Sequence, residues 1–354
     1  MPVDVAGSAT APPHRLMPPE WAPHVRTWLA WPTANDTFGP EGGERLARAR
    51  QAWGAVACAV AHHEPVTVVA NPGDRASAEQ GVHCRAQVVE LPLDDAWIRD
   101  SGPTFVHEPD GGTAVVNWVF NGWGQQEWAA WGHDRDLARR VGELAGVPVV
   151  DSPLVLEGGG VHVDGQGTAL VTETVLLDPQ RNPGLSKEDA EAELRRTLGV
   201  ERTVWLPRGL TADYGTYGTR GHVDLVAAFA RPGVVLAHVQ PDPAHPDHDV
   251  CAENLRLLRA ATDARGRRLE VVEVPAPTVA EVDGELVDYS YVNFYLANGG
   301  VVLCGFDDPR DEEVAALFRR VFPERAVDLV DAREIFANGG GIHCITQQQP
   351  AARG

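Results

Sequence analysis

The fold is indicated most clearly by residues 301–348, which read VVLCGFDDPRDEEVAALFRRVFPERAVDLVDAREIFANGGGIHCITQQ. The apolar run 301–306 predicts a buried strand, and residues 309–322 have the pattern of an amphipathic helix with acids first and arginines last. Residues 326–330 predict a second strand. The stretch ends on residues 339–348, which predict a third strand that carries polar side chains behind three glycines.

The same order of strand, helix, strand and polar strand recurs four more times upstream. The polar strands of these copies are predicted over residues 94–106, 156–164, 221–228 and 290–297. Two strands separate successive helices, whereas one strand separates them in a doubly wound sheet, so each copy is able to form a small sheet with one covering helix. We therefore expect an α/β fold in which five ββαβ-type units close into a fivefold pseudosymmetric propeller around a central channel.

No low-complexity linker divides the 354 residues. We expect a flexible N-terminal tail over 1–16, one domain over 17–350 and a short C-terminal tail over 351–354. The N-terminal stretch lacks the apolar segment of a signal peptide, and no run of about 18 apolar residues offers a membrane span. The five cysteines are odd in number and form no CxxC pair, which favours a reduced, cytoplasmic chain.

Charge and lysine content exclude several classes of function. The formal net charge is −20, which argues against nucleic acid and anionic membranes as partners and is compatible with a cationic substrate. Lys187 is the only lysine, and it lies at a predicted helix start where Ser186 and Asp189 form a capping-box pattern. Schiff-base enzymes, pyridoxal enzymes and P-loop proteins all need a placed lysine, so these classes are disfavoured.

The polar strands carry the residues that are hardest to explain by packing. In a closed ring, equivalent positions of successive units converge on the axis, so we expect Asp100, Glu157, His222, Asp224 and Cys344 to face one another. A lone cysteine is usually a small buried apolar residue, but Cys344 lies between glycines and glutamines rather than in an apolar strand. We expect it to be a nucleophile.

His222 is the best candidate for a partner base. In GHVD, His222 and Asp224 are two residues apart, which places them on one face of a strand. A histidine beside a carboxylate is a tuned acid or base, and its charge lowers the pKa of a nearby thiol. Taken alone, GHVD is equally compatible with a core histidine. His162 is a weaker candidate, and His343, directly before Cys344, is expected to face the other side of its strand.

The three acids indicate the class of substrate. Three carboxylates around a thiol are unsuited to acyl transfer, because an oxyanion needs hydrogen-bond donors. They suit a planar cation such as a guanidinium, which carboxylates bind in bidentate fashion. Trp97 is expected either to offer an aromatic face to that cation or to pack in the core. The spacings of a zinc site, a dinucleotide fingerprint and a P-loop are not found, so we expect no metal and no cofactor.

Together these motifs resemble the agmatine deiminase family, part of the guanidino-group-modifying (pentein) superfamily that includes arginine and peptidyl-arginine deiminases. The motifs that carry the resemblance are MPPEWAPHVRTWLAWP, DDAWIRDSGPTFV, LEGGGVHVDGQGT, RNPGLSKE, GHVD and GGGIHCITQQQP. The resemblance runs over about residues 17–350. It implies the fivefold propeller, a homodimer, no cofactor, and hydrolysis of agmatine to N-carbamoylputrescine and ammonia through an amidino-cysteine intermediate, a reaction of putrescine and polyamine biosynthesis.

The resemblance also implies a role for each site residue. It makes Cys344 the nucleophile and His222 the general acid and base. It has Asp100 and Asp224 bind the guanidinium, and Glu157 contact the guanidinium and orient the histidine. Trp97 would line the substrate pocket.

The chain departs from the family pattern beside GHVD, where it has Arg220 and Leu225. This departure leaves arginine or peptidyl-arginine open as the substrate of the deiminase. The independent alternatives are a catalytically silent propeller that binds guanidines, an amidinotransferase and a metal-dependent hydrolase.

Overall fold

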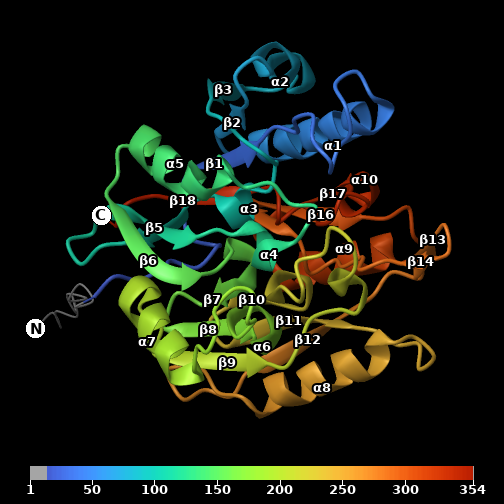
Figure 1. Ribbon diagram of the computed structural model, residues 1–354. Coiled ribbons are helices and arrows are strands. Elements are labelled where there is room, and N and C mark those ends of the chain that lie inside the picture. The colour runs from blue at the N-terminus through green and yellow to red at the C-terminus, as the bar shows by residue number, and fades with distance from the viewer. Residues whose placement is uncertain (1–13, 354) are drawn as a thin grey trace, which may run out of the picture.

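A computed structural model describes residues 14–353 of the protein. It has a mixed α/β fold with five sheets of three or four strands and one two-stranded hairpin. Within the described range no sheet closes on itself as a barrel. Helices α1 (Glu44–Ala61), α7 (Lys187–Leu198) and α8 (Asp247–Ala260) lie on the outside of the molecule, whereas the short α3 (Ile98–Ser101) and α4 (Gly122–Gln125) lie near its middle (Figure 1).

Four of the sheets share one topology. Their first two strands are antiparallel neighbours, and the third strand runs parallel to the second after a helical crossover. These sheets are β4 (Thr104–His107), β5 (Thr113–Val119) and β6 (Val149–Val155); β7 (Val161–Val163), β8 (Thr168–Thr172) and β9 (Arg202–Leu206); β10 (Ala227–Arg231), β11 (Val234–Val239) and β12 (Glu270–Pro275); and β15 (Tyr295–Ala297), β16 (Gly300–Gly305) and β17 (Ala326–Asp331). The crossover helices are, in the same order, α5 (Leu137–Ala145), α7, α8 and α9 (Asp311–Val321).

The fifth sheet joins the two ends of the chain. The last strand, β18 (Gln347–Pro350), pairs antiparallel with the first, β1 (His24–Ala30), and β2 (Val66–Ala70) and β3 (Ala86–Glu90) extend the sheet in parallel. Helix α1 joins β1 to β2, and α2 (Arg75–Gly81) joins β2 to β3. The remaining elements are α6 (Glu173–Leu176), α10 (Arg333–Phe336), the hairpin β13 (Glu281–Val282) and β14 (Glu285–Leu286), and the 3₁₀ turns η1 (Asp134–Asp136), η2 (Gly158–Gly160), η3 (Ala212–Tyr214) and η4 (Val223–Leu225).

The predicted boundaries of the repeating units are wrong by one element. We expected each polar segment to close its own sheet, but it opens the next one: β7 pairs with β8 and not with β6. The reason is loop length. The strand after each polar segment follows at once through a short turn, and an antiparallel pair forms most readily across such a turn. The number of helix-bearing sheets is still five.

The polar segments are also not continuous strands. Each begins with a turn, namely α3, η2, η4, the turn at 291–293 and the turn at 342–345, and only then continues into β4, β7, β10, β15 or β18. Glycines and aspartates favour such turns, and local bonds such as Val226 N to Val223 O at 2.9 Å close them. The alternation of a strand therefore does not apply to GHVD or to the His343–Cys344 pair.

The helix starts follow the sequence more closely. Ser186 caps α7, and its Oγ accepts a hydrogen bond from the Asp189 backbone N–H at 3.1 Å, as the capping-box pattern predicts. Much of the predicted N-terminal tail lies outside the described residues, and of its last residues Leu16 forms an antiparallel bridge with His107. Among residues 14–353, no helix combines the length and apolar character that crossing a membrane requires.

Candidate active site

The turns that open the sheets bring the predicted site residues together. Asp100 lies in turn α3, and Glu157 directly precedes η2. His222 directly precedes η4, and Asp224 lies within η4. Cys344 lies in the turn before β18. Turns α3 and η2 pack against each other, as do η2 and η4. All five residues are buried, with at most 4% of any of them exposed. The predicted convergence of these side chains is therefore observed, on turns rather than on strands.

The Cys344 thiol lies among both donors and acids. Gly341 N–H and Asn293 Nδ2 each lie 3.4 Å from Sγ, and Asp224 Oδ2 lies 3.7 Å from it. Burial raises the pKa of the thiol well above its ordinary value, and the charges of Asp224 and Asp100 raise it further. The thiol is therefore protonated in the empty site, and a bound cation would favour the nucleophilic thiolate.

His222 is held between two carboxylates. Its Nε2 lies 3.2 Å from Glu157 Oε2, and its Nδ1 lies 3.7 Å from Asp100 Oδ1. Burial alone would lower the pKa of the imidazole, but Asp100, Glu157 and Asp224 outweigh it and raise the pKa to about 9. At neutral pH the side chain is therefore an imidazolium with a proton to donate.

Glu157 is fixed by Arg181. Arg181 Nε lies 3.0 Å from both Glu157 oxygens, and its two terminal nitrogens donate to Asp178 Oδ2 at 2.9 Å and Thr219 O at 2.7 Å. Burial would raise the pKa of Glu157, but Arg181 and His222 lower it to about 2. Glu157 therefore stays ionised and holds His222 in its charged form.

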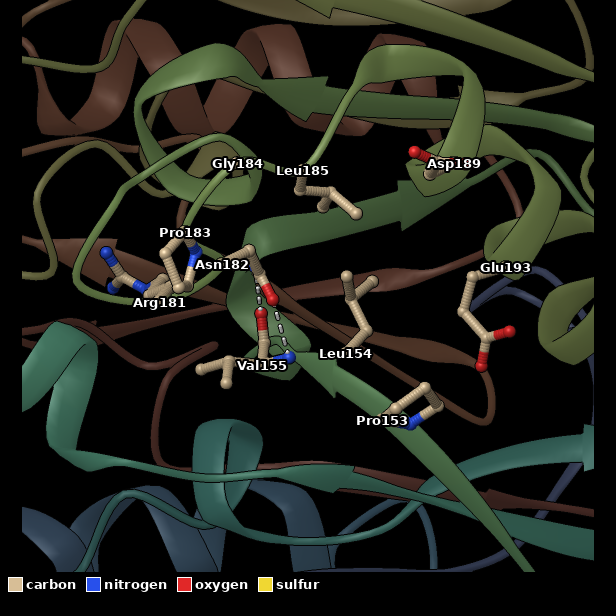
Figure 2. Close-up of a pocket in the computed structure, with 10 residues that line it drawn as sticks. All are labelled: Pro153, Leu154, Val155, Arg181, Asn182, Pro183, Gly184, Leu185, Asp189 and Glu193. Carbon is tan, nitrogen blue, oxygen red and sulfur yellow. Dashed lines mark hydrogen bonds between the residues drawn. The ribbon is translucent and has the colours of Figure 1, made fainter.

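The loop that carries Arg181 is tied to the end of β6. The Asn182 amide accepts from Val155 N at 3.0 Å and donates to Val155 O at 2.9 Å, as Figure 2 shows. The cavity in that view, about 520 Å³, includes Arg181 in its lining but none of the five predicted site residues. This cavity lies beside the Arg181 side chain, and Cys344 does not line it.

Two buried polar atoms of the site have no hydrogen-bond partner, namely His222 Nδ1 and Asp224 Oδ1. A Cβ on Gly159 would come within 2.6 Å of the first of these atoms, His222 Nδ1, and within 2.9 Å of both Asp100 Oδ1 and Asp224 Oδ2. Unpaired buried polar groups are costly unless a ligand completes them. His222 Nδ1 and Asp224 Oδ1 therefore each have capacity left for a hydrogen bond to a small ligand, and the lack of a side chain on Gly159 lets the surrounding side chains pack close together.

Asp100 is positioned by two donors. Its Oδ1 accepts from Gly159 N at 3.1 Å, and its Oδ2 accepts from Trp123 Nε1 at 2.9 Å. Burial raises the pKa of Asp100 to about 6, with His222 opposing the rise and Asp224 and Glu157 adding to it. Trp123 is in the left-handed region, at φ 54°, and its ring stacks on Trp128 at 5.1 Å.

Trp97 is placed between the core and the thiol. It is 4% exposed and packs edge-on against Trp53 at 5.3 Å, in the aromatic cluster that also includes Phe38. The edge of its ring also reaches the glycine run, since a Cβ on Gly340 would lie 2.9 Å from the Trp97 ring and 3.0 Å from Cys344 Sγ. Core packing and a place beside the thiol are both observed.

The position expected for His343 is wrong. It does not point away from the site: its Nδ1 lies 2.8 Å from Asp224 Oδ2, because residues 342–345 form a turn in which neighbouring side chains do not alternate. Sequence reasoning also assigned no role to Glu20, Arg181, Trp123 or Asn293. Glu20 and Arg181 lie in motifs that carry the family resemblance, which was the available signal, but only the tertiary structure gives their contacts.

Arg220 and Leu225, the two residues that depart from the family pattern, both contact other parts of the protein. Arg220 NH1 lies 3.6 Å from Asp178 Oδ2 and 3.4 Å from the carbonyl of Gly124, and about a third of its side chain is exposed. Leu225 is 1% exposed and packs in the core. Neither offers a free charge beside the thiol.

Comparisons with known proteins show the family to which the chain belongs. The family model of Porphyromonas-type peptidyl-arginine deiminase matches residues 16–350. A Streptomyces coelicolor protein, whose name as an agmatine deiminase is provisional, is 62% identical over 335 residues, which are 94% of this chain and 98% of that protein. The agmatine deiminase of Stutzerimonas stutzeri is 43% identical over 364 residues, with 95% of each chain covered.

A solved structure extends the likeness to the fold. It is the agmatine deiminase of Enterococcus faecalis catalysing its reaction, and it superimposes with a TM-score of 0.89 at 33% identity, covering 98% of each chain. These matches confirm the resemblance that the motifs predict. The chain belongs to the family of Porphyromonas-type peptidyl-arginine deiminases.

Proposed function

We propose that the protein is a hydrolase that converts agmatine and water to N-carbamoylputrescine and ammonia. The observation that carries the proposal is the buried convergence of Cys344, His222, Asp100 and Asp224: Asp224 Oδ2 lies 3.7 Å from Cys344 Sγ, Asp100 Oδ1 lies 3.7 Å from His222 Nδ1, and His222 Nδ1 and Asp224 Oδ1 have no hydrogen-bond partner. Several similar proteins that are named agmatine deiminases support the choice of substrate.

In this proposal the substrate guanidinium lies between Asp100 and Asp224. Asp224 Oδ1 is free to accept a hydrogen bond, and a carboxylate pair matches the planar donors of a guanidinium. The bound cation offsets the two charges that keep Cys344 protonated, so binding itself lowers the pKa of the thiol. The thiolate thus forms next to the carbon that it attacks.

The chemistry follows from the charge of His222. The Cys344 thiolate adds to the guanidinium carbon, and the His222 imidazolium gives its proton to the amino group that leaves as ammonia. An amidino-thioether remains on sulfur. The now neutral His222 takes a proton from water, and the resulting hydroxide adds to the same carbon. The C–S bond then breaks, and the hydroxyl proton goes to sulfur and replaces the proton that the thiol released to water when the substrate bound. The ureido product leaves, with His222 again protonated. Glu157 keeps His222 oriented, and Trp97 borders the substrate beside the thiol.

The far end of the substrate is proposed to point toward the glycine run before Cys344. A cavity of about 440 Å³ there is lined by residues that include Tyr217, Gly339, Glu285 and Asp288. Burial and the charge of Asp213 raise the pKa of Asp288 to about 7, a sign that this acid lacks a cationic partner. The primary amine of agmatine is such a partner, whereas the carboxylate of arginine would be repelled.

Two further observations favour a small, free guanidine. The reacting groups are almost fully buried, which suits a small molecule better than an arginine within a protein chain. Arg220, the residue that left arginine open as a substrate, is already paired with Asp178.

The proposal includes the architecture that the repeats predict. We propose that the five helix-bearing sheets form one propeller domain over 17–350, with tails over 1–16 and 351–354, and that the site lies in its central channel. The homodimer, the absence of nucleic-acid and membrane partners, and the cytoplasmic location remain predictions of the sequence and its resemblance.

The test compares ammonia release from agmatine, arginine and a peptide that contains arginine. We expect turnover of agmatine at least about a hundredfold above that of the other two, since each unpaired or repelled charge in a buried site reduces binding strongly. Cys344→Ser is expected to abolish turnover while circular dichroism and thermal unfolding stay unchanged. Preferred turnover of arginine, or retained turnover in the serine variant, would refute the assignment; guanidine binding without ammonia release would indicate a silent binding protein.

A further inference from the structure

His343 is bound by a carboxylate at each of its ring nitrogens. Nδ1 lies 2.8 Å from Asp224 Oδ2, and Nε2 lies 2.7 Å from Glu20 Oε1. A neutral imidazole has one donor and one acceptor, so it makes only one of these two bonds to ionised carboxylates. Both bonds form together when the ring is an imidazolium. The geometry therefore indicates a buried ion triad in the order Glu20, His343, Asp224.

The groups around this triad balance its charges. Glu20 also faces Arg99 NH1 at 3.4 Å and His162 Nε2 at 3.6 Å, and the rings of His162 and His343 lie 6.2 Å apart. Burial and Arg99 lower the pKa of His343, but Glu20 and Asp224 together raise it above its ordinary value. Against the effect of burial, His343 lowers the pKa of both acids. All of these side chains are buried, so solvent screens the ion pairs little.

We propose that Glu20 and His343 are positioning residues that act through Asp224: the imidazolium holds Asp224 Oδ2, so that Oδ1 stays free and charged for the substrate guanidinium. This inference rests on the proposed function, because the task of Asp224 is to bind that guanidinium. Glu20, which precedes β1, would in this way support a reaction centred on the turn before β18. His343 backbone N–H further donates to Asn293 Oδ1 at 3.0 Å, which ties the same turn to a neighbour of Cys344.

A metal ion is the rival explanation for this cluster. Glu20, His162 and His343 are the group among residues 14–353 whose ligand atoms lie close enough to hold one. Two observations favour a protonated His343 ring over a bound metal ion. The 2.7 Å between Nε2 and Oε1 is a hydrogen-bond distance with no room for an ion between them, and Arg99 already supplies a cation.

The test uses Glu20→Gln in the full chain. The amide keeps an acceptor for His343 but removes the charge, so the pKa of His343 falls and the ring loses its proton as the pH rises. The ratio of kcat/KM for agmatine, variant to wild type, is expected to fall about tenfold between about pH 6 and about pH 8, mainly through KM, and to recover when the pH is lowered. A structural role alone would give a ratio that does not change with pH.

Glu64→Gln is the matched control. Glu64 is a buried acid that also pairs with a histidine, His24, at 3.1 Å, and it contacts none of the site residues itself. Because His24 Nε2 lies 2.9 Å from the backbone carbonyl oxygen of Glu20, this variant also controls for a disturbance of the Glu20 backbone. Its ratio to wild type is expected to stay constant over the same pH range. If Glu20→Gln and Glu64→Gln give the same flat ratio, the positioning role is wrong, even though agmatine turnover by the wild-type enzyme upholds the proposed function.

A second measurement does not depend on turnover. In the wild-type protein with ¹⁵N-labelled histidine, the ring signals of His343, assigned by their loss in His343→Gln, should show both nitrogens protonated at about pH 7. A neutral His343 ring there would overturn the proposal. So would one equivalent of bound metal in the purified protein, because a metal on Nε2 would replace the bond to Glu20.

Discussion

The crowding of side chains around Gly159 gives the sharpest test of the geometry of the proposed site. The perturbation is Gly159→Ala, which adds one methyl group. Its Cβ would lie 2.6 Å from His222 Nδ1 and 2.9 Å from both Asp100 Oδ1 and Asp224 Oδ2. Real contacts to a Cβ are mostly longer than 3.4 Å, so His222 or its neighbours must move by about 0.8 Å.

The expected magnitude follows from that displacement. A shift of about 1 Å in a reacting group lowers the rate about a hundredfold, which is about 2.7 kcal/mol of transition-state stabilisation. The same displacement moves the Asp100 and Asp224 carboxylates that are proposed to bind the guanidinium, so KM should rise as well as kcat fall. Gly159 does not have a positive φ, so the backbone accepts alanine, and stability should fall by only about 1–2 kcal/mol from overpacking.

The assay is steady-state ammonia release from agmatine, together with isothermal titration of agmatine and thermal unfolding. Gly132→Ala serves as the control, because this exposed glycine has only Asp94 Oδ2 near its Cβ, at 3.8 Å, and has no positive φ. We expect the control to match wild type in all three measurements. If Gly159→Ala keeps kcat/KM within about threefold of wild type, the positions of His222, Asp100 and Asp224 around Gly159 do not control the reaction and the proposed site geometry is wrong.

Two further predictions concern the charges of the site. Arg181→Met leaves the Glu157 carboxylate buried without its cation and should lower the free energy of unfolding in urea by about 3–5 kcal/mol. A loss below about 1 kcal/mol would show that the ion pair between Arg181 and Glu157 does not stabilise the fold. The pH dependence of kcat/KM should be bell-shaped: activity rises with pH as Asp100 ionises near its raised pKa of about 6, and it falls as His222 loses its proton near a pKa of about 9. Full activity in acid, well below pH 6, would show that Asp100 need not be charged, and no decline up to about pH 10 would exclude His222 as the proton donor.

Several local features follow from the sequence alone. The amphipathic pattern of residues 309–322 predicts α9, and Ser186 caps α7 as its spacing with Asp189 predicts. Such features depend on residues close in the chain, whose interactions survive in any fold. The negative net charge and the acids of the polar segments also predict a guanidinium site, because the type of a residue determines its charge.

The sequence does not determine where each repeating unit begins and ends. Sequence periodicity predicts five helix-bearing units but not which neighbour each short strand pairs with, since that depends on turn geometry and on β18 returning to β1. The same holds for GHVD. His222 and Asp224 do share a site, but a 3₁₀ turn places them there and not the alternation of a strand.

Only the tertiary structure decides which charges meet. Glu20 and His343 are 323 positions apart, and Arg181 reaches Glu157 from a separate loop. No local pattern marks these contacts, because each is made by packing between segments distant in the chain. The sequence by itself determined the reagents of this protein, a thiol, an imidazole and three acids. The fold decided their distances, and in a buried site of low dielectric those distances set the pKa values on which the chemistry depends.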